Sequence, residues 1–286
     1  MIRCLSTKKE KMSGTVCVTG AGGYVASWLI KLLISHGYNV HGTLRNPGDE
    51  KYVHLKSLEN ASEKLKLFKA DLLDFDSILA AVKGCDGVFH VASPVPSSSV
   101  EVVAPALEGT LNILKACSQA KIRRAVVVSS VAEAEALEYA KQNGLDVVTV
   151  CPTLVLGPML QHAPNASSLF LIKLLREGFE EVENKLRSIV DVRDVADALK
   201  LVYEKREAEG RYICTAHRVK NQDLVQTLRQ IYPSYNYPKS FKEGEELGPK
   251  LSSEKLQGLG WKYRPLTETL VDSVEMYKQA GLIHSS

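Results

Sequence analysis

The sequence lacks the long apolar runs and the basic blocks that mark membrane-spanning and nucleic-acid-binding proteins. A membrane-spanning helix needs about 18 uncharged apolar residues, and the best candidate, Val147 to Leu160, is interrupted by two prolines and a glycine. The formal net charge is +3 over 286 residues, with Lys and Arg scattered among Glu and Asp. We therefore expect a soluble, cytoplasmic protein with neither a membrane nor a nucleic acid as its partner.

Cysteine pairs are also missing. The six cysteines form no Cys-x-x-Cys pair and have no companion histidines at metal-ligand spacing, so the pattern favours reduced core residues and indicates no metal site. The first eleven residues carry four basic side chains but no long apolar or amphipathic stretch. Residues 1–11 are therefore interpreted as a disordered extension, with a targeting signal as the alternative.

The chain does contain short apolar, β-branched runs that alternate with helical patterns. The expected strands are Thr15 to Thr19, Tyr38 to Thr43, Leu65 to Ala70, Gly87 to Ala92, Ala125 to Ser129 and Asp146 to Val150. The expected helices are Ser27 to Ser35, Ser77 to Lys83, Val102 to Ala120 and Ala132 to Lys141. Strands that are apolar on both faces belong in a parallel sheet covered by helices on both sides. The fold class is therefore α/β, a Rossmann-type doubly wound parallel sheet.

The pattern becomes less regular beyond Pro158. Helices are expected at Leu169 to Arg176, Val195 to Lys205 and Asn221 to Tyr232, a strand at Arg211 to Thr215, and a loop at Tyr232 to Gly248. We expect residues 12–155 to form the nucleotide-binding domain. Residues 156–286 would mainly form a smaller substrate lobe over the carboxyl ends of the strands, where ligands bind in such sheets, with some segments returning to the sheet.

A glycine motif occupies the junction between the first strand and the first helix. Its Gly-x-x-Gly-x-x-Ala spacing suits a tight turn, a close approach of pyrophosphate to the backbone, and close helix-strand packing. Phosphates would then meet the free N–H groups at the helix N-terminus. The candidate residues are Gly20, Ala21, Gly22, Gly23, Tyr24, Val25 and Ala26. The alternative is a glycine turn with only a structural role.

Two cations follow the second strand, where an acidic residue would bind the ribose of NAD. Arg45 lies two residues after the expected strand end at Thr43, and Lys51 lies six residues beyond Arg45. A cation at this place accommodates a 2′-phosphate, and the planar Arg fork suits a phosphate dianion. The pattern therefore predicts NADP(H) as the cofactor, the alternative being a pair of solvated surface cations.

With these residues placed, the chain resembles the extended short-chain dehydrogenase/reductases of the cinnamoyl-CoA reductase and dihydroflavonol reductase group, in the NAD-dependent epimerase/dehydratase superfamily. The similarity extends from Met12 to Ile283. It rests on the segments Val18 to Tyr24, Arg45 to Pro47, Lys69 to Asp74, Gly84 to Pro94, Cys151 to Pro158 and Val192 to Ala196. The resemblance implies a carbonyl reductase for a small phenylpropanoid-like substrate, and we expect a monomer.

The resemblance also implies further site residues. Asp71 and Leu72 would border the adenine, Val91, Ala92 and Ser93 would line the cofactor path, and Pro152, Thr153, Leu154, Val155 and Ser167 would lie near the nicotinamide. The alternatives are a turn or cap role for Asp71 and a loop hydroxyl at Ser93. Asp191 and Asp194 are expected to cap the helix from Val195.

The catalytic centre that the resemblance implies is incomplete. In the family a Tyr hydroxyl protonates the developing alkoxide, a Lys four residues later lowers the pKa of that tyrosine, and a Ser polarises the carbonyl. Ser130 matches the serine. The next helical residues resemble the part of the family helix beyond the lysine, so about forty residues are absent between Ser130 and Ala132.

No other tyrosine and lysine replace the missing pair. Tyr139 and Lys141 are two residues apart, and such residues do not face one another on a helix. The literal Tyr-x-x-x-Lys matches are Tyr52 to Lys56, on the adenine side, and Tyr235 to Lys239, which contains a proline. We reject both on placement. Closing the shortened crossover is expected to require that the helix slides or that the strand end peels away.

Three functional hypotheses follow. The first is an NADP-binding member of the reductase family whose carbonyl reduction is lost or greatly weakened. The second is a noncatalytic, NADP-responsive binding or regulatory protein. The third is a nonfunctional truncated isoform that folds poorly. All three share the cofactor motif and the missing Tyr-Lys pair, so they differ in whether the chain folds, binds NADPH and turns over substrate.

Overall fold

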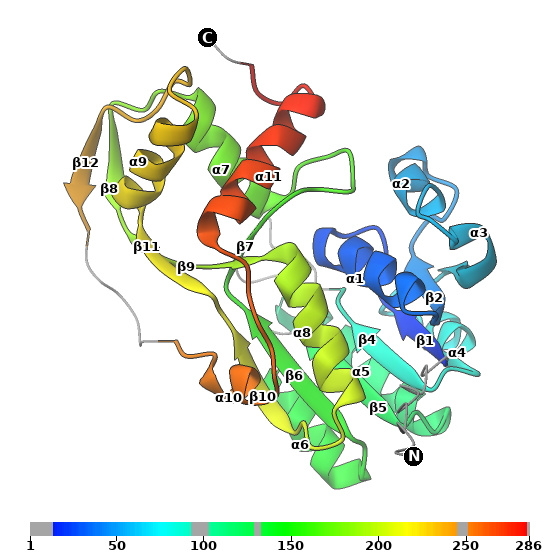
Figure 1. Ribbon diagram of the computed structural model, residues 1–286. Helices are drawn as coiled ribbons and strands as arrows, with labels where there is room; N and C mark the ends of the chain where they lie inside the picture. The colour runs from blue at the N-terminus through cyan, green and yellow to red at the C-terminus, as the bar shows by residue number, and fades with distance from the viewer. Residues whose placement is uncertain (1–13, 93–102, 129–132, 245–250, 285–286) are drawn as a thin grey trace, which may run out of the picture.

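The computed structural model describes residues 14–92, 103–128, 133–244 and 251–284 (Figure 1). The expected extension 1–11 and the candidate residues Ser93 and Ser130 lie outside the described residues. The remaining candidate residues all lie inside them.

A seven-stranded parallel sheet forms the centre of the fold, in the order β10-β6-β5-β4-β1-β2-β3. Its strands are β1 (Thr15–Val18), β2 (Asn39–Leu44), β3 (Leu65–Lys69), β4 (Gly87–His90), β5 (Arg124–Val128), β6 (Val147–Pro152) and β10 (Gly210–Cys214). The order from β3 to β6 is that of the dinucleotide-binding fold, whose crevice opens where the strand order reverses. The predicted fold class is therefore confirmed, and the reversal lies between β1 and β4.

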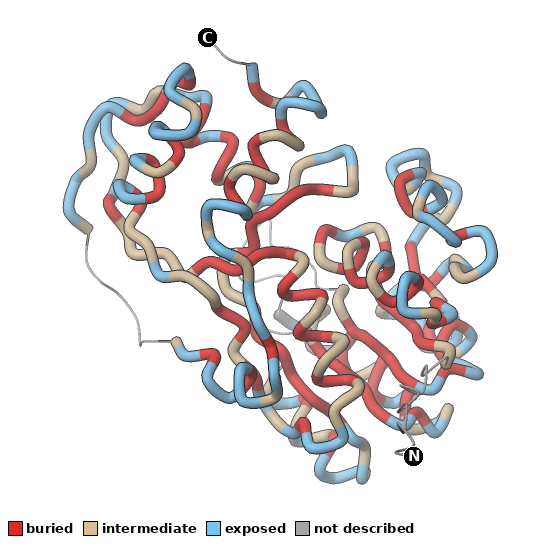
Figure 2. The backbone as a smooth tube through the Cα atoms, in the orientation of Figure 1, coloured by how far each residue is buried: buried red, intermediate tan, exposed pale blue. Residues whose placement is uncertain are grey.

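Helices cover both faces of this sheet. One face packs against α1 (Tyr24–Ser35) and α8 (Val192–Glu204), and the other against α4 (Phe75–Val82), α5 (Val103–Gln119) and α6 (Glu133–Asn143). Neighbouring residues of one strand alternate between the faces: Val126 belongs to the first core, whereas Ala125 and Val127 belong to the second. Figure 2 shows the central strands as buried segments. Burial on both faces explains why these strands are continuous apolar runs.

The C-terminal lobe has two small sheets. β7 (Leu154–Leu156), β9 (Leu186–Asp191) and β11 (His217–Lys220) form one, and β8 (Glu181–Asn184) and β12 (Ser240–Glu243) form the other. Its helices are α7 (Ala166–Arg176), α9 (Asn221–Ile231) and α11 (Leu266–Gln279), whereas α10 (Glu254–Gly258) packs against β10 of the central sheet. The prediction of a continuous loop at Tyr232 to Gly248 is wrong at β12, a largely exposed polar strand that pairs with β8.

The start of α8 corrects another prediction. The helix begins at Val192, and the carboxylate of Asp191 caps it by accepting a 2.8 Å hydrogen bond from the Arg193 N–H. Asp194 lies inside the first turn, and its carboxylate binds Arg264 from a distant segment. The cap is therefore confirmed for Asp191 and wrong for Asp194, because a buried carboxylate needs a charged partner that local sequence does not reveal.

The crossover from β5 to β6 is short. β5 stays paired with β6 through Val128, which lies opposite Val150, and α6 begins at Glu133. The helix packs Ala136 and Ala140 into the core on its face of the sheet. Up to its last described residue, the strand end does not peel away from the sheet.

The short elements between β2 and β3 are η1 (Glu50–Tyr52), α2 (Val53–Lys56) and α3 (Ala61–Lys64). Across the described ranges, no helix is both long and apolar enough to cross a membrane. The same ranges hold no group of three or more His, Cys, Asp or Glu side chains that could bind a metal ion. Their five cysteines are buried and unpaired.

Candidate nucleotide-binding site

The glycine turn after β1 has the backbone that its spacing predicts. Gly20 has a φ of +65°, and a Cβ there would lie 3.0 Å from the Ala92 Cα, so a larger residue would be strained and crowded. A Cβ on Gly23 would have the Gly20 carbonyl oxygen as its nearest neighbour, at 3.2 Å. The turn is therefore packed against β4 at Gly20 and accessible at Gly23.

The N-terminus of α1 leaves backbone N–H groups without acceptors among the described residues. Gly23 is its N-cap, no side chain caps the helix, and its first turn holds no acidic residue. Among the described residues, no acceptor receives the N–H groups of Tyr24, Val25 or Ala26. Free N–H groups and the helix dipole favour negative charge at this end. The turn therefore fits the pyrophosphate of a dinucleotide.

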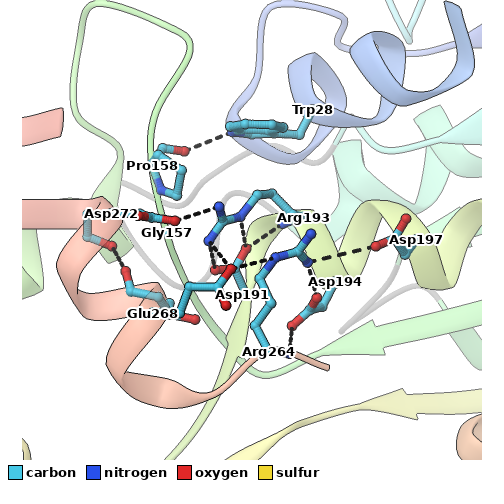
Figure 3. A network of polar contacts seen from close by, with 12 residues as sticks. Trp28, Gly157, Pro158, Asp191, Arg193, Asp194, Asp197, Arg264, Glu268 and Asp272 are labelled. Atoms are coloured by element: carbon cyan, nitrogen blue, oxygen red, sulfur yellow. Dashed lines mark hydrogen bonds and ion pairs between the residues drawn. The ribbon is translucent and has the colours of Figure 1, made fainter. Parts of the chain in front are cut away.

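The side chain of Tyr24 points away from this anion site. Its hydroxyl donates a 2.7 Å hydrogen bond to the Gly157 carbonyl, and burial raises its pKa well above the ordinary value. One helical turn on, the Trp28 indole N–H donates to the Pro158 carbonyl at 2.8 Å (Figure 3). Tyr24 can therefore serve a cofactor only through its backbone, and both aromatic side chains anchor α1 to the turn after β7.

A buried hydrogen-bond chain joins the ends of β1 and β4. The N–H groups of Val91 and Ala92 donate to Thr19 Oγ1 at 3.1 and 3.0 Å. The Thr19 hydroxyl therefore directs its own proton to His90 Nδ1, 2.9 Å away. His90 Nε2 then carries the proton that is donated to Thr110 Oγ1 at 3.2 Å, whose hydroxyl donates to a carbonyl one turn earlier in α5. The chain fixes Val91 and Ala92 beside the glycine turn.

The neutral state of His90 is set by burial. The residue is 2% exposed, and burial lowers the pKa of its imidazole to about 4. Nδ1 accepts the hydrogen bond from Thr19, so this nitrogen carries no proton and the ring is neutral. His90 was not among the residues singled out from the sequence, although a histidine inside an apolar strand was a visible signal.

The two cations predicted for the 2′-phosphate lie at the end of β2 and in η1. Arg45 is exposed and makes no hydrogen bond or ion pair within the described residues. The Lys51 ammonium forms a 2.8 Å ion pair with Asp49, whose carboxylate also caps η1 by accepting from the Lys51 N–H. Asp49 thus competes with any phosphate for Lys51.

The Tyr52 ring covers the middle of the glycine turn. A Cβ on Gly22 would collide with its Cδ1 and Cε1 atoms, and the Lys51 ammonium lies 4.9 Å from the ring centroid. Tyr52 therefore belongs to the nucleotide side of the fold. This placement agrees with its rejection as a catalytic tyrosine.

The adenine-side candidates make structural contacts. The Asp71 carboxylate accepts a 3.0 Å hydrogen bond from the Leu73 N–H, as in a local turn. The Leu72 carbonyl accepts from the Asn112 amide at 3.0 Å. The turn role considered as an alternative for Asp71 is therefore present, and its second carboxylate oxygen has no partner among the described residues.

The candidates for the nicotinamide side follow β6, two strands away from β4. Pro152 ends β6, and Leu154 and Val155 begin β7. The Thr153 N–H donates to the Cys214 carbonyl of β10 at 3.1 Å, and its hydroxyl donates to the hydroxyl of Thr215, the next residue, at 3.2 Å. Ser167 lies half-buried in the first turn of α7. Pro152 and Thr153 thus lie at the carboxyl end of β6, as the glycine turn lies at the carboxyl end of β1 in the same parallel sheet.

An ionic network docks α11 onto the start of α8 (Figure 3). Arg193 binds Asp191 through two nitrogens, at 2.9 and 2.8 Å, and Asp272 of α11 at 2.6 Å. Arg264 binds Asp194 from the segment before α11. Removing one member of such a buried pair leaves an uncompensated charge. These residues hold α8, α11 and the segment before α11 together.

Comparisons with known proteins identify the family of this chain. Residues 16–138 match the NAD dependent epimerase/dehydratase family. Cinnamoyl-CoA reductase 2 of Medicago truncatula is 40% identical over 311 residues, covering 93% of this chain and 92% of the relative. Cinnamoyl-CoA reductase 1 of Petunia hybrida is 39% identical over 308 residues, with the same coverage of both chains.

A solved structure has the same fold. The crystal structure of vestitone reductase from alfalfa superposes with a TM-score of 0.82 at 30% identity, covering 95% of this chain and 100% of that one. The fold and the glycine turn define an extended Rossmann-type oxidoreductase. The chain belongs to the NAD-dependent epimerase/dehydratase family, among the cinnamoyl-CoA reductases and their relatives, which confirms the resemblance drawn from the sequence.

Proposed function

We propose that this chain binds NADP(H) and derives from carbonyl reductases of phenylpropanoid-like substrates, with its own carbonyl reduction lost or strongly reduced. The observation that carries the proposal is the sequence of α6, which lacks a Tyr-x-x-x-Lys pair. The helix begins at Glu133, and its only tyrosine, Tyr139, has Asn143 in place of a lysine four residues later. The alignment with the Medicago truncatula relative runs over 311 residues, more than the 286 of this chain, so that relative carries segments absent here.

The proposed cofactor role is divided among three groups of residues. The backbone N–H groups from Tyr24 to Ala26 would bind the pyrophosphate, and Arg45 and Lys51 the 2′-phosphate. Residues 71–72, 91–93, 152–155 and 167 would border the adenine, the cofactor path and the nicotinamide. NADPH supplies a hydride when bound. Residues 12–155 would form the nucleotide-binding part and residues 156–286 most of the substrate lobe.

The proposed loss of activity follows from proton chemistry. Ser130 would donate a hydrogen bond to the substrate carbonyl, but no tyrosine hydroxyl would protonate the developing alkoxide. A positioned general acid contributes about 10²- to 10⁴-fold to rate, so we expect kcat to be lower by at least that factor than in a relative with the complete centre. Binding of NADPH does not depend on this acid.

Two measurements on the purified chain test the proposal. Thermal unfolding with and without NADPH should show stabilisation, about 2.7 kcal/mol at 100 times the Kd. NADPH consumption with hydroxycinnamoyl-CoA thioesters, aldehydes and dihydroflavonols should stay near background. The matched control carries a relative's segment between Ser130 and Ala132 and should gain turnover. Robust turnover by the unaltered chain would sink the proposal of impaired catalysis.

A second candidate is a noncatalytic, NADP-responsive binding protein. The packing of the shortened crossover favours it over a poorly folded truncation product. The Glu133 carboxylate accepts from Thr149 Oγ1 at 2.9 Å and pairs with Arg211 at 3.1 Å, so α6 is held against β6 and β10. Cooperative melting that responds to NADPH, with no turnover, would support this candidate. Melting without cooperativity would favour the truncated isoform instead.

A further inference from the structure

A buried histidine ties the Lys51 segment to the helix that follows the glycine turn. His54 lies in α2, two residues after η1, and is 8% exposed. Its Nε2 atom is 3.0 Å from the hydroxyl of Ser27, a fully buried residue in the first turn of α1. The two residues come from separate elements, so the contact joins α2 to α1.

The Lys51 carbonyl fixes the tautomer of His54. Nδ1 is 3.0 Å from that carbonyl oxygen, which can only accept, so Nδ1 carries the proton. Nε2 of the neutral ring is then an acceptor, and it competes with the Gly23 and Ala21 carbonyls for the single proton of the Ser27 hydroxyl. Burial lowers the pKa of His54, and His162 from the loop after β7 lowers it further, which agrees with a neutral ring. One imidazole thus holds the Lys51 backbone and the Ser27 side chain together.

Ser27 in turn is part of the glycine turn. Its N–H donates to the Gly23 carbonyl at 2.9 Å, and its hydroxyl lies 2.7 Å from the same oxygen. A second contact, the Tyr52 ring over Gly22, holds the same segment on the same turn. The Lys51 side chain itself is 59% exposed, and its ammonium contacts Asp49 and the Tyr52 ring, which both belong to the same segment. The position of Lys51 relative to the turn therefore depends on the two contacts that hold this segment there.

We infer that His54 is a positioning residue for the cofactor's 2′-phosphate: it sets the distance between Lys51 and the pyrophosphate-binding turn, and with it the preference for NADP over NAD. The inference rests on the proposed NADP site. A cofactor bridges the two anion sites rigidly, so a cation displaced by about 1 Å loses much of its contact with a phosphate. NAD lacks the 2′-phosphate, so its affinity does not depend on this distance.

The test is the ratio of the Kd values for NADH and NADPH, measured by fluorescence titration on the full chain. His54→Leu should weaken NADPH binding about five- to tenfold, the scale of one lost hydrogen bond together with added freedom of Lys51, and NADH binding less than twofold. Lys51→Ala should lower the ratio as well. In the Lys51→Ala background His54→Leu should have no further effect on the ratio, because His54 acts through Lys51. His36→Gln, at an exposed histidine, is the matched control.

The outcomes separate this inference from the proposed function. If the unaltered chain binds NADPH no more tightly than NADH, the NADP site fails and this inference fails with it. If the unaltered chain prefers NADPH and folded His54→Leu keeps that preference, the inference alone is wrong. Should His54→Leu fail to fold, Ser27→Ala decides, with an expected two- to threefold drop in the ratio; an unchanged ratio overturns the inference.

Discussion

Lowering the pH tests the buried hydrogen-bond chain that runs from Thr19 through His90 to Thr110. Burial lowers the pKa of His90 from its usual value near 6.5 to about 4. Between these two values the unfolded chain binds a proton at His90 and the folded chain does not. The stability that neutral His90 contributes is therefore complete above about pH 6.5 and is lost as the pH falls toward 4.

The size of the effect follows from the two pKa values. At pH 5 the unfolded imidazole is almost fully protonated, while the folded one is about nine-tenths neutral. Acidification to pH 5 therefore lowers the free energy of unfolding by about 2 kcal/mol, which corresponds to about 1.5 pH units between the unfolded pKa and pH 5. The residue is 2% exposed, so solvent does little to reduce this figure.

Urea unfolding at pH 7.5 and pH 5.0 measures this loss of unfolding free energy. The unaltered chain should lose about 2 kcal/mol more on acidification than His90→Gln, which cannot titrate at this position. His36→Gln removes an exposed histidine and should retain the full pH dependence. Equal losses for the unaltered chain and His90→Gln would refute the reasoning, because His90 would then have the same pKa folded and unfolded.

Three further predictions concern the nucleotide side. Gly20→Ala forces a side chain into a positive φ and against the Ala92 backbone, so we expect a loss of about 1–3 kcal/mol in urea unfolding together with weaker NADPH binding. Asp49→Asn keeps the cap of η1 and frees Lys51, so titration should show NADPH bound severalfold more tightly, and unchanged binding would contradict the competition. Tyr24→Phe leaves a buried carbonyl without its donor and should cost about 1–3 kcal/mol of stability with no change in the NADPH to NADH ratio; a changed ratio would place this side chain at the cofactor.

The sequence predicts the central sheet well because its strands are buried on both faces. Runs such as Ala125 to Val128 are apolar throughout, and each lies between turn signals. The polar strands β8 and β12 give no such signal. Each is four residues long and mostly half-buried or exposed, so their pairing depends on the lobe around them and not on periodicity.

The backbone of the site was predictable and its side-chain contacts were not. The spacing from Gly20 to Ala26 predicts a turn and a helix N-terminus, and local geometry suffices to form both. The bond from Thr19 to His90 joins residues 71 positions apart, and that from Tyr24 to Gly157 joins residues 133 apart. Such contacts exist only after the sheet and the lobe have assembled. For the same reason Asp194 could be mistaken for a cap.

The proposed loss of carbonyl reduction is tested by the rate of NADPH oxidation with a hydroxycinnamoyl-CoA thioester, at an NADPH concentration that titration shows to saturate the chain. We predict a bound cofactor and a rate lower by at least about 10²-fold than that of the matched chain with the segment restored between Ser130 and Ala132. Equal rates for the two chains would contradict it, because catalysis would then not need the missing tyrosine and lysine.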